Sequence, residues 1–147
     1  MDSTLSSALI SAVISALVSA IVAWMSRRTD CRRDLESELS EILKIGIKYP
    51  YFEQQAFTDL WNPELAKTDE RYAAYDLYAT LVFNHLEKRC RFCKFNLKKV
   101  HNDLDMKSWV RLHAKYWGNP VDPYENILGY DVKFVKLVNI CLGIKES

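Results

Sequence analysis

Uncharged residues dominate the beginning of the chain. The stretch from Leu5 to Met25 has 21 residues without a charge, and as an α-helix it would span about 31 Å, close to the roughly 30 Å of a bilayer core. Four arginines follow it, and basic flanks favour the cytoplasmic side: Arg27, Arg28, Arg32 and Arg33. The pattern predicts one transmembrane helix over residues 1–26, a single pass through the inner (cell) membrane, with the amino terminus outside and the remainder cytoplasmic.

Small side chains recur every fourth residue in and just before this stretch. They are Ser3, Ser7, Ser11, Ser15 and Ser19, with Ala8, Ala12, Ala16 and Ala20 one step on. Two adjoining rows of small residues let helices approach closely, so the rows predict a homo-oligomer. The alternative is that each hydroxyl bonds to the carbonyl oxygen four residues earlier in its own helix.

After residue 26 the apolar positions follow a helical period, and no segment alternates at period two. The pattern predicts a helical stalk or linker over 27–48 and a cytosolic helical ligand-binding domain over 49–147. Within that domain we expect helices at 51–61, 71–100, 103–117 and 132–142, the third capped by Asn102 or Asp103 and the last by Asp131. Apolar side chains at three- and four-residue spacing predict the core face of the longest helix: Phe83, Leu86, Cys90, Cys93, Leu97 and Val100. The expected fold class is all-α.

Motifs that bring catalytic groups together are absent from the sequence. It has no glycine-rich phosphate loop, no HExxH and no nucleophile elbow. Cys90 and Cys93 fall on the predicted core face, which favours structural thiols over metal ligands. His85, His101 and His113 have no carboxylate placed near them by spacing. We therefore expect no enzyme, no catalytic residue, no metal and no cofactor.

Charge is segregated along the chain. Residues 86–115 contain nine Lys and Arg against three Asp and Glu, a net +6, whereas residues 34–80 have a net −6. Cations for phosphates and flat rings for bases suit a nucleotide or a single-stranded nucleic acid, and duplex nucleic acid is not expected. The candidate phosphate ligands are Arg91, Lys94, Lys98, Arg111 and Lys115, and the candidate stacking residues are Trp109, which suits a core position equally, and Trp117. Pairing with the acidic segment and binding of lipid headgroups are the alternatives.

The layout as a whole resembles a known family. A serine-rich span, cytosolic arginines and a small helical body with a basic, tryptophan-containing stretch are similar to the membrane-bound, cyclic tetra-adenylate-binding effectors of type III CRISPR systems in Vibrio. The resemblance implies a homotetramer for antiviral defence, whose cytosolic domain binds cyclic tetra-adenylate and perturbs or opens the membrane segment in the lipid bilayer. The segment Leu60-Trp61-Asn62-Pro63 with Tyr72 to Glu87 also resembles bacterial single-pass proteins of unknown function.

Two functions of other classes remain open at this point. One is a membrane-anchored interaction protein whose basic patch recruits a protein or an anionic lipid. The other is a membrane-damaging toxin that needs no ligand.

Overall fold

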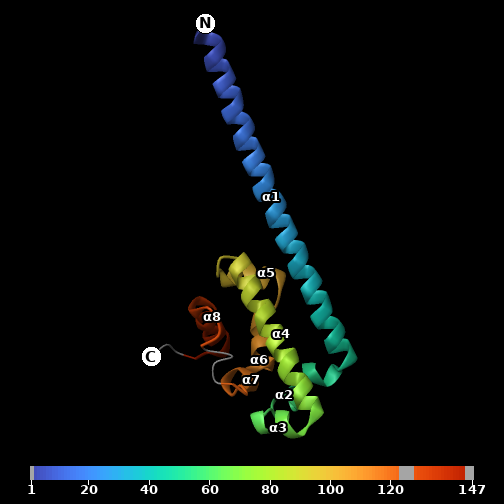
Figure 1. The fold of residues 1–147 in the computed structure, drawn as a ribbon. Helices are drawn as coiled ribbons and strands as arrows, with labels where there is room; N and C mark the ends of the chain where they lie inside the picture. The colour runs from blue at the N-terminus through green and yellow to red at the C-terminus, as the bar shows by residue number, and fades with distance from the viewer. Residues whose placement is uncertain (1, 123–127, 145–147) are drawn as a thin grey trace. The chain divides into compact units, whose positions relative to one another are not determined.

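The computed structural model describes residues 2–122 and 128–144, with side chains from residue 11 onward. Within these ranges the protein is all-helical, in agreement with the predicted all-α class, and contains no strand (Figure 1). The helices are α1 (Asp2–Lys48), η1 (Pro50–Glu53, a 3-10 helix), α2 (Gln55–Thr58), α3 (Pro63–Thr68), α4 (Glu70–Phe92), α5 (Leu97–Asp103), α6 (Met106–Leu112), α7 (Ala114–Gly118) and α8 (Val132–Leu142).

The chain divides into two compact units, Met1–Glu36 and Ser37–Ser147. The first consists of the greater part of α1. Its large apolar side chains are solvent-exposed wherever they are described between residues 13 and 25, with Leu17 59% exposed and Val22 60% exposed. Self-association through the serine and alanine rows stays a prediction, and Ser3, Ser7 and Ala8 lie outside the residues whose side chains are described.

The predicted transmembrane helix is the main correction to the sequence analysis. Among the described residues, no helix combines the length and the apolar character needed to cross a bilayer. The first part of the predicted span, Leu5 to Ile10, lies outside the residues with described side chains. Because no described helix could cross a membrane, the predicted membrane-spanning helix and the predicted single-pass location in the cell membrane are wrong.

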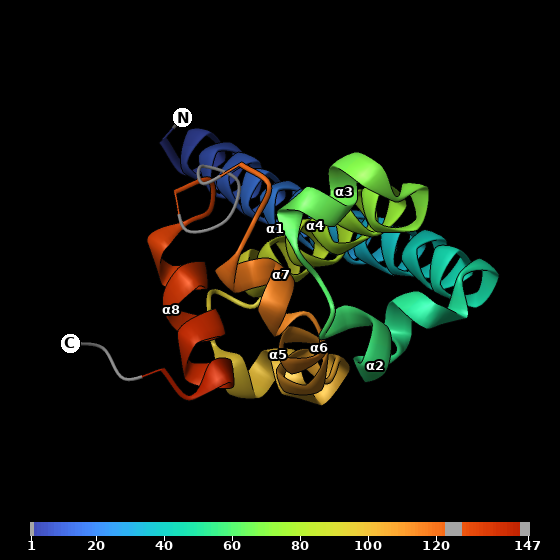
Figure 2. The same ribbon diagram turned by 90° about the horizontal axis from the view of Figure 1, so that it is seen from below.

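The second unit is organised around α4. In Figures 1 and 2, α8 and the last turns of α1 lie on opposite sides of α4. Three of the α4 tyrosines, Tyr72, Tyr75 and Tyr78, are buried together with Val82 and Leu86. These positions follow three- and four-residue steps, so one face of the helix enters the core along its whole length.

Aromatic rings make up much of that core. Phe57 stacks on Tyr72 with ring centroids 4.4 Å apart, and Trp61 lies 5.5 Å from Tyr75 and donates its ring N–H to the carbonyl oxygen of Asn119. Such ring pairs stabilise a fold by about 0.5–1.5 kcal/mol each beyond the burial of area. They hold η1, α2 and α3 against the first half of α4.

The long helix predicted over 71–100 is interrupted. α4 ends at Phe92, and both Lys94 (φ 54°) and Phe95 (φ 57°) adopt left-handed backbone conformations. The backbone N–H of Phe95 donates to the carbonyl oxygen of Cys90 at 2.7 Å, which closes the end of α4. Asn96 then caps α5 by accepting from the backbone N–H of Lys99. The three- and four-residue spacing of apolar residues continues across this break although the helix ends there. The apolar residues of α5 still face the same core.

Two other predicted helices are also divided. The segment 51–61 forms η1 and α2, and the segment 103–117 forms α6, capped by Asp105, followed by α7. The last helix is confirmed in full. Asp131 caps α8 by accepting from the backbone N–H of Lys133, and Gly143 ends it with a left-handed φ of 74°.

Candidate functional site

The seven sequence-predicted ligand-binding residues do not form one site. Arg91, Lys94 and Lys98 lie at the end of α4, in the following turn and on α5. Lys115 lies on α7, whose Tyr116 hydroxyl is 2.7 Å from Thr80 Oγ1 in the middle of α4. Figure 1 accordingly shows α5 and α7 at different levels along α4. The cations of α5 and of α7 therefore lie apart along α4 (Figure 1).

The two arginines among these residues already have protein partners. The Arg91 guanidinium lies 3.0 Å from Glu87 Oε1 and 3.5 Å from Asp131 Oδ2. Arg111 Nε donates to the carbonyl oxygen of Cys141 at 3.2 Å, which ties α6 to the end of α8. The lysines at 94, 98 and 115 are exposed. The basic stretch is therefore partly used in holding the fold together.

Trp117 is a core residue. Its side chain is only 2% exposed, and its ring centroid lies 4.7 Å from Phe83, 5.6 Å from Tyr130 and 5.9 Å from Phe134. With rings of α4 and α8 around it, the indole has no open face on which a base could stack. The structure thus places this predicted stacking residue between two helices.

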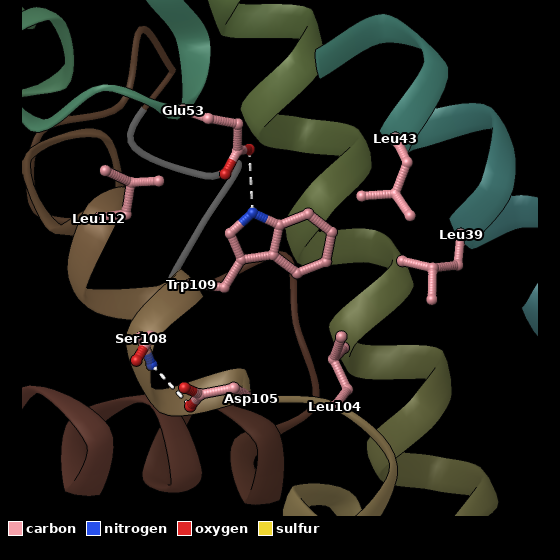
Figure 3. A pocket seen from close by; sticks show the side chains of 8 residues that line it. All are labelled: Leu39, Leu43, Glu53, Leu104, Asp105, Ser108, Trp109 and Leu112. Atoms are coloured by element: carbon pink, nitrogen blue, oxygen red, sulfur yellow. Dashed lines mark hydrogen bonds between the residues drawn. The ribbon is translucent and has the colours of Figure 1, made fainter. Parts of the chain in front are cut away.

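Trp109 leads to a different site. It is 8% exposed, and its ring borders an open groove with a volume of about 300 Å³. Leu39 and Leu43 of α1 lie on one side of the indole and Leu112 of α6 on the other, with Glu53 of η1 above it (Figure 3). The lining residues are Leu39, Leu43, Glu53, Leu104, Asp105, Ser108, Trp109 and Leu112.

Glu53 is the best-connected polar residue of the groove. Its Oε1 accepts hydrogen bonds from the Tyr78 hydroxyl and, at 3.0 Å, from Trp109 Nε1. His113 Nε2 lies 3.7 Å from the same oxygen. Because α4, α6 and the turn before α7 each supply one of these groups, the carboxylate is held from three parts of the second unit.

The surroundings of Glu53 favour its ionised form. Burial acts to raise the pKa of this carboxyl, but His113, Tyr78 and Trp109 together outweigh it, and the pKa lies below its ordinary value of 4.5. Glu53 is therefore negatively charged at neutral pH. Its side chain remains 37% exposed, so the charge also faces solvent and the groove.

This shift predicts a pH dependence of stability. A carboxyl whose pKa is lowered by folding stabilises the native state above its ordinary pKa of 4.5, and the contribution is lost as the pH falls through the lower folded value. We expect the free energy of unfolding of the wild type to fall more steeply below pH 4.5 than that of Glu53→Gln, measured by urea unfolding across a pH series. Parallel curves would show that Glu53 is not responsible.

A buried pair lies behind Glu53. His113 is fully buried, and the Tyr75 hydroxyl lies 2.8 Å from its Nδ1. Burial raises the pKa of Tyr75, so the phenol stays protonated. The two ring nitrogens of His113 therefore face different groups, Nδ1 the Tyr75 hydroxyl and Nε2 the Glu53 carboxylate. Since neither Tyr75 nor His113 reaches the surface, this pair orients the carboxylate and does not contact a ligand.

Two other residues considered in the sequence analysis, His85 and Cys90, are buried inside the fold. His85, fully buried, lies 3.2 Å from Glu38, which also pairs with Lys88 at 2.6 Å. Both carboxylates lie far from their histidine along the chain, Glu38 47 residues from His85 and Glu53 60 residues from His113, so sequence spacing could not show these contacts. Burial, with the neighbouring Cys93 and Cys141 thiols, raises the pKa of the Cys90 thiol to about 12, which disfavours the thiolate that metal binding requires.

The sequence analysis missed Glu53 as a site residue. It lies 56 residues from Trp109 and 60 from His113 along the chain, so no local spacing connects them. The one signal available is the acidic residue at the end of an aromatic, proline-initiated segment, Pro50-Tyr51-Phe52-Glu53. Comparison of the chain with family models, with curated proteins and with solved structures finds no match.

Proposed function

We propose that residues 37–147 form a binding module that receives the apolar part of a small ligand in the groove beside Trp109. The observation that supports this function is the composition of the groove. Four leucines and an indole line an open space of about 300 Å³, which is at the lower limit of typical ligand pockets.

The exposure of the groove leucines supports the same function. Leu43 is 50% exposed although it stands beside the partly buried Leu39 and Leu104. Covering apolar surface contributes about 25 cal/mol for each Å² removed from water. A ligand that fills the groove therefore gains free energy from surface that the protein itself leaves open.

A probe of known chemistry tests this function. We expect 1-hexanol to shift the NMR signals of the Trp109 indole N–H and of the Leu39 and Leu104 methyl groups in the full-length protein. Leu43→Lys places a charge in the groove and should abolish these shifts. Leu77→Lys is the matched control, because Leu77 is 68% exposed on α4 and does not line the groove. Equal binding by both variants, or no shift in the wild type, would contradict the proposal.

Binding of a phosphate-bearing nucleotide such as cyclic tetra-adenylate is a second candidate function. Its support is a group of three exposed lysines, Lys94, Lys98 and Lys99, in and after the turn between α4 and α5. Lys133 adds a fourth cation, with its Nζ 5.7 Å from the ring centroid of Phe95. Clustered lysines attract phosphates, and the affinity of such contacts falls as salt concentration rises.

Charge reversal tests this second candidate. If cyclic tetra-adenylate binds here, Lys94→Glu with Lys98→Glu should weaken binding at least about tenfold in calorimetry, because two phosphate contacts become repulsive. Lys44→Glu with Lys67→Glu makes the same change in net charge on α1 and α3, and should leave the affinity nearly unchanged. A wild type that gives no binding heat with cyclic or linear oligoadenylates would exclude this function.

A further inference from the structure

We propose that the polar end of the groove ligand is an organic cation, an ammonium or guanidinium group attached to an apolar body. This inference rests on the proposed binding function and adds the chemical class of the ligand. It follows from three features of the groove, which are the free oxygen of Glu53, the position of Asp105 and the indole of Trp109.

The first feature is the unused capacity of Glu53. Its two hydrogen bonds and its contact with His113 all fall on Oε1. In the described part of the chain, Oε2 accepts no hydrogen bond. An ionised carboxylate has acceptor sites on both oxygens, so Glu53 is held in place through one oxygen and presents the other for a ligand.

The second feature is another negative charge in the same groove. Asp105 caps α6 by accepting from the Ser108 backbone N–H at 3.1 Å (Figure 3). Hydrogen bonding to Ser108 lowers the pKa of this carboxyl, so it is ionised as well. His101 and Lys107 lie near Asp105 and lower its pKa further, but none of the eight lining residues is basic. The lining therefore has a net negative charge.

The third feature is the indole. Trp109 is fixed by the hydrogen bond from its Nε1 to Glu53, and its ring stands between the leucines of α1 and Leu112 (Figure 3). The indole therefore offers apolar surface for the body of a ligand directly beside the carboxylate that would bind its head.

These features discriminate between ligands of equal size. A cationic head gains a charge-assisted hydrogen bond to Glu53 Oε2. A neutral hydroxyl gains an ordinary hydrogen bond, and a carboxylate head is repelled by both Glu53 and Asp105. The apolar contacts are the same in all three cases, so a difference in affinity reports on the head group alone.

The test compares hexylammonium, 1-hexanol and hexanoate on the full-length protein at neutral pH, followed by NMR titration. We expect hexylammonium to bind about tenfold more tightly than 1-hexanol, and hexanoate to bind most weakly. Glu53→Gln should remove this preference, because the amide carries no charge with which to attract the ammonium group. Asp105→Asn keeps a good helix cap and should reduce the preference by a smaller factor.

The outcomes separate this inference from the function on which it rests. Equal affinities for hexylammonium and 1-hexanol in the wild type would overturn the cationic ligand and leave the apolar binding function standing. Failure of all three probes to bind would overturn both. If Glu53→Gln does not fold, Asp105→Asn and 0.5 M salt serve as the test. A preference for hexylammonium that neither of them reduces would not be electrostatic and would overturn the cationic ligand.

Discussion

Trp117→Ala is expected to lower the free energy of unfolding by about 3–5 kcal/mol, the usual cost of removing a large aromatic side chain from a packed core. The indole joins Phe83 of α4 to Phe134 of α8, so its removal leaves a cavity between two helices. A domain of this size has a total stability of about 5–15 kcal/mol. Urea unfolding of the variant and the wild type measures the difference.

Trp24→Ala is the matched control for this substitution. Trp24 is 60% exposed, and the change should alter the free energy of unfolding by less than about 0.5 kcal/mol. A loss below 1 kcal/mol for Trp117→Ala would instead mean that the indole is not part of the core. That result would restore the earlier expectation that Trp117 is available to stack on a base.

Glu53→Leu is expected to lower the free energy of unfolding by about 2–3 kcal/mol. The substitution removes the acceptor for two buried donors, the Tyr78 hydroxyl and the Trp109 indole N–H. A buried donor without a partner costs about 1–3 kcal/mol, and water entering from the groove keeps the total near the lower part of that sum. It also removes the negative charge that faces His113 at 3.7 Å.

Two comparisons identify the cause of this loss. Glu53→Gln keeps an acceptor oxygen and should cost about 1 kcal/mol. Glu41→Leu removes an exposed carboxylate that pairs with Lys44 at 2.7 Å, and surface pairs contribute about 0–1 kcal/mol. If Glu53→Leu proves no more destabilising than Glu41→Leu in the same urea experiment, then Glu53 does not hold the groove residues in place.

The last helix shows what local sequence determines well. Asp131 before the apolar run and Gly143 after it predict both ends of α8, and the structure has the same ends. A capping side chain and a left-handed glycine act through neighbouring backbone groups, so nothing distant is needed to place them.

The break between α4 and α5 shows where local sequence fails. The apolar spacing runs through it without interruption, and Lys94 and Phe95 are not residues that usually adopt positive φ. Asn96 is the one local signal, as a cap for the next helix. The tyrosines of α4 were missed for another reason. Tyr72, Tyr75 and Tyr78 are buried like apolar residues, while their hydroxyls find partners such as His113 and Glu53.

The candidate site depends on contacts that no local pattern encodes. The segregation of charge along the sequence predicted a basic ligand-binding surface. In the structure, Arg91 pairs with Asp131, and Arg111 donates a hydrogen bond to the carbonyl oxygen of Cys141. Glu53 and Trp109 meet only because η1 and α6 pack on α4. The predicted membrane span was wrong because no helix among the described residues is both long and apolar enough to cross a bilayer.

Binding of a ligand in the groove should also be detectable at the end of α1. Leu39 and Leu43 form one of its walls, and they belong to the same continuous helix that ends at Lys48. A bound molecule contacts these side chains and opposes fraying of the turns that bear them. Amide protons in the last three turns of α1 will therefore exchange with deuterium more slowly once the groove is filled, while those near Leu17 keep their rate.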